Sequence, residues 1–183
     1  KEAYGFIYDP SIVVVEKTYQ YPSSLDQFER APFSILISSK ANPSRKWFFT
    51  GVHISPGKAP AEINKLYDVY EYYAKDSNLK SIMASSWLLM GDFNADCSYM
   101  RKSDWVNNIF AMKSNQFKYL IHTGQGTTVS GSNCAYDRFV TTKLSLQPSD
   151  AKVFKFDAAF QLAPEFAKKV SDHFPIELTI SGW

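Results

Sequence analysis

The sequence lacks both a long hydrophobic run and a large excess of charge. No stretch reaches the roughly 18 apolar residues that a membrane-spanning helix needs, so no such helix is predicted. The 20 lysines and arginines nearly balance the 18 aspartates and glutamates, which leaves a formal net charge of +2 at pH 7. A polyanionic partner would therefore be bound by a local cluster of side chains rather than by the field of the whole protein.

Cysteine is scarce as well. The two cysteines, Cys97 and Cys134, match no metal-binding spacing. They are either a buried pair of free thiols or a single disulfide, and a disulfide would indicate an oxidising compartment. The Asn-Pro-Ser at 42–44 contains the proline that prevents glycosylation. Because the chain starts at Lys1 without a methionine or an apolar leader, we interpret it as a processed chain or a piece of one.

Length and composition are those of one globular domain. The chain has 183 residues, 45% of them hydrophobic, which is enough for a real core. An apolar pattern at i, i+3, i+4 and i+7 after Pro60 predicts a helix that ends near Asp76–Asn78, and further helix is predicted within 104–112 and 156–166. The mixture of strands and helices over short connections predicts one α/β domain with layered sheets over residues 1–183. The predicted strands are Tyr4–Tyr8, Ile12–Tyr19, Phe33–Ser38, Trp47–His53, Trp87–Gly91, Asp137–Thr142 and Ile176–Ile180.

Polar side chains gather where several of these strands begin or end. A single histidine at a strand end is most often a surface residue, and Asx-rich turns form by bonding their own backbone. Several such clusters are harder to explain in that way, because α/β folds build their sites at strand ends. The residues concerned are Glu2, His53, Asp92, Asn94, Asp137, Asp172 and His173.

These residue types suit the hydrolysis of a phosphodiester. Carboxylate and amide oxygens are ligands for Mg²⁺ or Ca²⁺ rather than for zinc, which takes more histidine or cysteine. Two imidazoles that carboxylates can orient would supply one general base and one general acid. A divalent metal with an acid and a base describes the attack of an activated water on a phosphodiester.

Three motifs carry a resemblance to a known family. The runs GDFNADCSY (91–99) and NCAYDR (133–138) resemble hallmarks of deoxyribonuclease I and its secreted paralogues. The run SDHFP (171–175) is similar to the ending shared by the wider endonuclease/exonuclease/phosphatase superfamily. GDFN and SDH occur across the superfamily, whereas CSY together with NCAYDR is specific to the deoxyribonuclease I branch. The resemblance covers essentially the whole chain, and it implies a sandwich of two mixed β-sheets flanked by helices.

The resemblance implies a role for each polar cluster. His173, oriented by Asp137, would be the general base, and His53, oriented by Glu2, would be the general acid that protonates the leaving 3′ oxygen. Cys97 and Cys134 would form the family's structural disulfide. The residues implied at the metal are Asp92, Asn94 and Asp172. Those implied to contact DNA or its phosphates are Arg30, Asn94, Tyr99 and Tyr136.

The function implied is a divalent-metal-dependent endonuclease that hydrolyses DNA with little sequence specificity and leaves 5′-phosphate ends. Mg²⁺ or Mn²⁺ is the implied cofactor. The implied partner is double-stranded DNA, contacted along its backbone and minor groove by a monomeric protein that is not held in a membrane. Secretion, or residence in a secretory or lysosomal compartment, is the location that fits.

The chain also departs from the family pattern. The family domain is longer at its N-terminus, where it supplies a metal-binding glutamate and a phosphate-contacting asparagine. We therefore predict an N-terminally incomplete domain, the C-terminal two-thirds or so, without the N-terminal strands and helix and by itself a poor nuclease. Gly126 stands where one calcium-site carboxylate is expected, and Asp26 is the acidic residue left in the other calcium loop. The resemblance thus implies weakened Ca²⁺ sites.

Two other functions compete with the nuclease. One is a catalytically impaired, nuclease-derived domain that only binds a partner, and the shortened N-terminus favours it. The other is a phosphodiester hydrolase of the sphingomyelinase or phosphoinositide phosphatase type, which would share the metal and the histidines. The two cysteines and the NCAYDR run argue against the second alternative.

Overall fold

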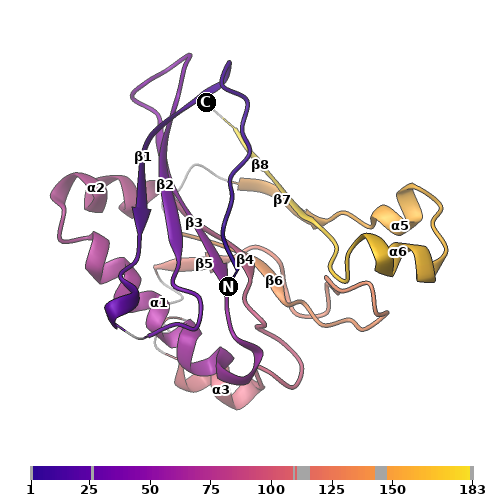
Figure 1. Cartoon of the computed structure of the whole chain (residues 1–183). Helices are drawn as coiled ribbons and strands as arrows, with labels where there is room; N and C mark the ends of the chain where they lie inside the picture. The colour runs from indigo at the N-terminus through magenta and orange to yellow at the C-terminus, as the bar shows by residue number, and fades with distance from the viewer. Residues whose placement is uncertain (1, 26, 109, 111–115, 143–147, 182–183) are drawn as a thin grey trace.

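The computed structural model describes residues 2–25, 27–108, 110, 116–142 and 148–181, and it confirms the α/β class (Figure 1). Within these residues the main layer is a six-stranded sheet in the order β1-β2-β3-β4-β6-β5, and a second sheet pairs β7 with β8. The sheet is mixed because β3 and β4 run parallel while their other neighbours are antiparallel. The strands are β1 (Val13–Gln20), β2 (Phe33–Ser39), β3 (Lys46–His53), β4 (Trp87–Asp92), β5 (Phe117–Tyr119), β6 (Asp137–Thr142), β7 (Pro148–Val153) and β8 (Ile176–Ile180).

Figure 1 shows helices α1 and α2 on one face of the main sheet and the second sheet, β7 and β8, on the other, with α5 and α6 on the side of the second sheet. None of the helices among the described residues is long and apolar enough to cross a membrane. The helices are α1 (Ala59–Tyr73), α2 (Ser77–Ser86), α3 (Lys102–Asn107), α5 (Phe156–Ala159) and α6 (Pro164–Val170), with 3₁₀ turns η1 (Ser23–Leu25) and η2 (Pro56–Lys58).

The alternation of side chains along the central strands creates two cores. Trp87 and Leu89 of β4 pack with the buried faces of α1 and α2, whereas Leu88 between them points to the other face. On that face Leu88 lies with Trp47 of β3, and side chains of β8 such as Ile176 pack against this cluster. Because successive side chains of a strand alternate between faces, a strand covered on both sides reads as one continuous apolar run. This explains the uninterrupted sequence of β4.

Two sequence predictions about the fold are wrong. Tyr4–Tyr8 is not a strand, because residues 2–9 have no ladder partner among the described residues, although Phe6 packs on the second core. The predicted helix after Pro60 ends at Tyr73, and a separate helix, α2, follows it. The break is made by Asp76, whose carboxylate accepts hydrogen bonds from the first backbone N–H groups of α2.

Candidate active site

The register of three neighbouring strands brings three of the predicted site residues to one edge of the main sheet. His53, the last residue of β3, stands opposite Asp92 at the end of β4. Asp92 in turn stands opposite Asp137, the first residue of β6. The sequence places these residues at strand ends, and the ladder places those ends side by side.

Gly91 allows β4 to approach β3 closely enough for this register. Its φ of +136° lies in the region that favours glycine, and a Cβ atom there would be 2.1 Å from the carbonyl oxygen of Val52. The backbone N–H of Ile54 then donates to the carbonyl oxygen of Asp92 at 2.8 Å, which continues the pairing past His53. Any other residue at position 91 would push apart the two strands that carry His53 and Asp92.

His173 joins this edge from the segment before β8. A single antiparallel bridge pairs it with Thr128 of the preceding loop. Its Nδ1 atom is 2.7 Å from Oδ2 of Asp137, and both side chains are largely shielded from solvent. The hydrogen bond with Asp137 is the main cause that raises the pKa of His173 to about 9, against the opposing effect of burial.

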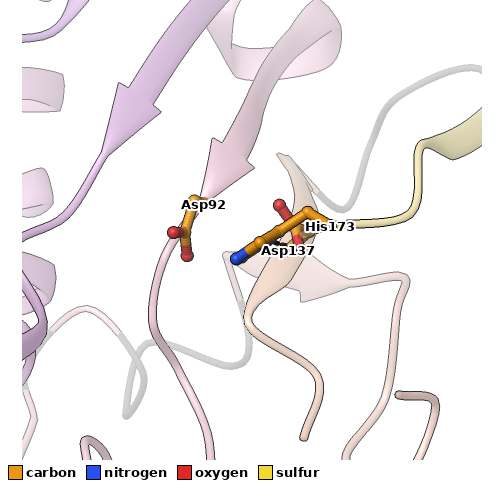
Figure 2. A group of neighbouring side chains, drawn as sticks. All are labelled: Asp92, Asp137 and His173. Carbon is orange, nitrogen blue, oxygen red and sulfur yellow. Dashed lines mark hydrogen bonds and ion pairs between the residues drawn. The ribbon is translucent and has the colours of Figure 1, made fainter. Parts of the chain in front are cut away.

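Asp92, Asp137 and His173 form a compact cluster with one ligand atom of each within 4.8 Å of the others (Figure 2). Burial raises the pKa of Asp92, and the neighbouring carboxylate of Asp137 raises it further. Asn94 holds Asp92 in place, since its backbone N–H donates to Oδ1 at 2.8 Å and its side-chain amide to Oδ2 at 3.1 Å. Two carboxylates that repel each other beside an imidazole are a donor set that fits a divalent cation.

The other side of Asp92 faces His53. Nε2 of His53 is 3.7 Å from Oδ2 of Asp92, and Nδ1 is 2.7 Å from Oε2 of Glu2. Glu2 also binds Arg30, with Nε of Arg30 at 2.5 Å from Oε2 and Nη2 at 3.1 Å from Oε1. The hydrogen bond from Arg30 is the main cause that lowers the pKa of Glu2. Glu2 is therefore held as an anion that orients both a guanidinium and an imidazole.

The two tyrosines predicted to contact DNA lie beside His173. The rings of Tyr99 and Tyr136 are 5.2 Å apart between centroids, and Tyr136 is 6.3 Å from the ring of His173. The predicted disulfide between Cys97 and Cys134 is present and joins the two segments that carry these tyrosines.

Not every predicted residue lies in the cluster at the strand ends. Asp172 is exposed and lies outside the cluster of Asp92, Asp137 and His173, although its charge is near enough to contribute to the raised pKa of His173. Asp26 falls outside the described residues. At Gly126 a Cβ atom would be 2.5 Å from the carbonyl oxygen of Ser132, so this loop conformation excludes a longer side chain there.

Some supporting residues escape sequence reasoning. Asp96 is buried and accepts hydrogen bonds from the backbone N–H groups of Cys97, which is in the disulfide, and of Ala135, which follows the other cysteine. The hydroxyl of Thr127 accepts from the N–H groups of Tyr136 and Asp137. Asp96 could be singled out as a second carboxylate in the 91–99 run, whereas nothing in the small-residue loop distinguishes Thr127 from its neighbours.

Solved structures agree with this architecture. A conserved protein of unknown function from Enterococcus faecalis V583 superposes with a TM-score of 0.61 at 17% identity, over 96% of this chain and 69% of that one. TDP2 from D. rerio, solved with a single-strand DNA product, superposes with a TM-score of 0.57 at 15% identity, over 91% and 67%. The endonuclease domain of the retrotransposon TRAS1 gives 0.52 at 14% identity, over 90% and 66%. The fold is thus that of the deoxyribonuclease I-like α/β sandwiches.

Sequence relatives narrow this class to one family. The chain is 40% identical to Deoxyribonuclease-1 of Bos taurus over 190 residues, which is 99% of this chain and 65% of that protein. It is 40% identical to the Ovis aries protein of the same name over 99% of this chain and 71% of that one, and 39% identical to Deoxyribonuclease-1-like 2 of Mus musculus over 98% and 64%. No protein-family model matches. The chain belongs to the deoxyribonuclease I family, and it spans slightly less than two thirds of the bovine protein.

Proposed function

We propose that the protein is a divalent-metal-dependent endonuclease that hydrolyses DNA with little sequence preference and leaves 5′-phosphate ends. One observation carries the proposal. Two imidazoles, His53 and His173, flank Asp92, and each has its Nδ1 atom 2.7 Å from a carboxylate. A base and an acid on either side of an anionic centre are what in-line attack of water on a phosphodiester requires.

His173 is the general base of this mechanism. With Nδ1–H held by Asp137, its neutral ring presents the unprotonated Nε2 to an attacking water and takes the proton as the new P–O bond forms. The raised pKa means that His173 must first lose a proton, and positive charge placed near Asp92 and Asp137 favours that loss.

His53 is the general acid. Its Nδ1 contacts the carboxylate of Glu2, so Nε2 is the nitrogen left to give a proton to the leaving 3′ oxygen when the P–O bond breaks. Arg30, held by the same carboxylate, is placed to contact a phosphate oxygen next to this acid. Water thus adds to phosphorus, and the products are a 5′-phosphate and a 3′-hydroxyl.

The metal proposed is Mg²⁺ or Mn²⁺. Asp92 would hold it, with Asn94 positioning that carboxylate and Asp137, His173 and Asp172 nearby. Bound there, the ion supplies charge that neutralises the carboxylates and the attacked phosphate.

The substrate proposed is double-stranded DNA, contacted along its backbone and minor groove by a monomer. Arg30 and Asn94 would contact phosphates, and the paired rings of Tyr99 and Tyr136 would offer an apolar surface to sugars and base edges. Secretion is the location that best fits a disulfide between Cys97 and Cys134. The relatives named above do not favour a lipid phosphodiesterase or a binding-only domain.

Plasmid nicking tests the proposal. The purified protein should relax supercoiled plasmid in Mg²⁺, and addition of EDTA should stop the reaction. His173→Ala should abolish the activity. His122→Ala is the matched control, because His122 is the remaining histidine of the chain and is exposed in a loop. Nicking that survives His173→Ala would contradict the proposal. So would the absence of nicking in Mg²⁺ or Mn²⁺ both by the unaltered protein and by a form extended with the family's N-terminal segment.

A further inference from the structure

The acid side of the site, which consists of Glu2, Arg30 and His53, is built from three segments that strand pairing alone does not hold together. Glu2 belongs to a segment with no ladder partner among the described residues, and Arg30 belongs to the loop between β1 and β2. Only His53 stands on a ladder. Two side chains outside the acid side nevertheless join the loop of Arg30 to the end of β3.

The first of these side chains is Glu62. It lies in the first turn of α1 and is only 2% exposed. Its Oε1 accepts a hydrogen bond from the backbone N–H of Glu29 at 3.0 Å, and its Oε2 accepts one from the backbone N–H of Ser55 at 2.9 Å. Glu29 directly precedes Arg30, and Ser55 follows His53 by two positions. One buried carboxylate therefore spans the two segments that carry the acid-side cations.

The second is Tyr4, two residues after Glu2. Its hydroxyl accepts a hydrogen bond from the backbone N–H of His53 at 3.0 Å and donates one to the carbonyl oxygen of Arg30 at 3.2 Å. Tyr4 thus bridges the same two segments as Glu62, at the adjacent positions. Together with the contacts from Glu2 to Arg30 and His53, these bonds close a ring around the acid side.

A simpler role for Glu62 is to cap the turn that opens at Ser55. That role explains the bond to Ser55 but not the bond to Glu29, which comes from a different loop. A parallel link exists at the surface, where Nζ of Lys58 is 3.6 Å from the carboxylate of Glu29, but an exposed ion pair of this kind contributes little. The buried carboxylate is the stronger link.

We infer that Glu62, with Tyr4, is a positioning residue for the reaction: it sets the separation of Arg30 and His53 and so keeps the imidazole on Glu2. Among the described residues neither side chain hydrogen-bonds to Asp92, Asp137 or His173, although Tyr4 lines the same small cavity as Asp92. Neither is therefore needed to orient the base. Loss of the link should therefore weaken protonation of the leaving oxygen and leave the attack by water largely intact. This inference rests on the proposed nuclease function.

A leaving group that needs no proton separates positioning from a general structural role. The substrate is a DNA duplex with one 3′-bridging sulfur, which leaves as a thiolate, compared at the same position with the all-oxygen duplex. Glu62→Gln replaces one acceptor oxygen by an amide, so one buried N–H loses its partner. We expect the rate of cleavage of the oxygen linkage to fall about 10- to 100-fold in this variant. The fold loss in the rate for the sulfur linkage should be smaller by a factor of at least about 10.

Matched controls keep the outcomes distinct. Glu71→Gln makes the same chemical change at an exposed position of α1 and should alter neither rate. Tyr4→Phe removes only the bridging hydroxyl and should show the same preference for the sulfur linkage, which keeps the test valid if Glu62→Gln does not fold. Equal losses on both linkages, no loss on the oxygen linkage, or a sulfur linkage that the unaltered protein does not cut would overturn the inference. If neither the unaltered protein nor a form extended with the family's N-terminal segment cuts all-oxygen DNA in Mg²⁺, the proposed function itself is refuted.

Discussion

Asp137→Asn should lower the pKa of His173 and of Asp92 together, because the carboxylate of Asp137 raises both. For His173 the hydrogen bond with Asp137 is the largest cause of the rise to about 9, and for Asp92 the charge of Asp137 adds to burial. The rise from the ordinary histidine value corresponds to about 3 kcal/mol in favour of the imidazolium. Since the ring is 28% exposed, solvent weakens the interaction, and we expect the pKa of His173 to fall by about 1–2 in the variant.

Proton NMR titration in EDTA measures this directly. The chain has three histidines, so few imidazole signals need assignment, and His173→Ala identifies the relevant one. A His173 signal that titrates at the same pH in Asp137→Asn as in the unaltered protein would refute the assigned cause.

The same pair makes stability depend on pH. Because the pKa of His173 is higher in the folded state, its stabilising contribution is complete below the ordinary histidine pKa of 6.5 and is lost as the pH rises through about 9. Urea unfolding in EDTA should therefore show a stability that declines over this window in the unaltered protein, and a flatter profile in Asp137→Asn. Parallel profiles would contradict the coupling.

Three further outcomes follow from the site and its support. His53→Ala should lower the kcat of plasmid nicking by about 10²–10⁴-fold, and a rate near that of the unaltered protein would remove His53 from the mechanism. Gly91→Ala should destabilise the protein by about 2–4 kcal/mol in urea unfolding, because its Cβ would meet the carbonyl oxygen of Val52; an unchanged midpoint would show that the strands can separate at little cost. Replacing Cys97 and Cys134 by serine should cost about 4 kcal/mol, since the bridge closes a loop of 37 positions, and a loss below about 1 kcal/mol would argue against this loop-entropy account.

The sequence predicts the central strands of the fold better than its edges. Buried strands such as β4 are recognisable because both of their faces are covered, and the ends of β6 and β8 agree with the predicted Asp137–Thr142 and Ile176–Ile180. The polar residues at the ends of those strands, after β4 and at the start of β6 and β8, then mark the candidate site, since charged and amide groups at a strand end need either solvent or a function.

The errors occur where structure depends on distant partners. Strands β5 and β7 went unpredicted because each forms mainly by pairing with one neighbour, β6 or β8, rather than through a strong local pattern. The sequence does not predict helix α2, because residues 77–86 are rich in serine and have only a weak apolar stripe, although Asp76 caps the helix in the structure. The strand expected over residues 4–8 does not form, because an apolar segment becomes a strand only where a neighbouring strand pairs with it.

The two sides of the site differ in how they are held, and this difference predicts how they fail. On the base side Asp92 and Asp137 are fixed by the register of β4 and β6 inside a sheet whose central strands are buried on both faces. A change that moves those residues must disturb the sheet, so loss of the base and loss of stability should occur together. On the acid side Glu2 and Arg30 depend on hydrogen bonds from single side chains, and those can be removed one at a time. Variants that retain their stability but lose protonation of the leaving group should therefore be found on the acid side.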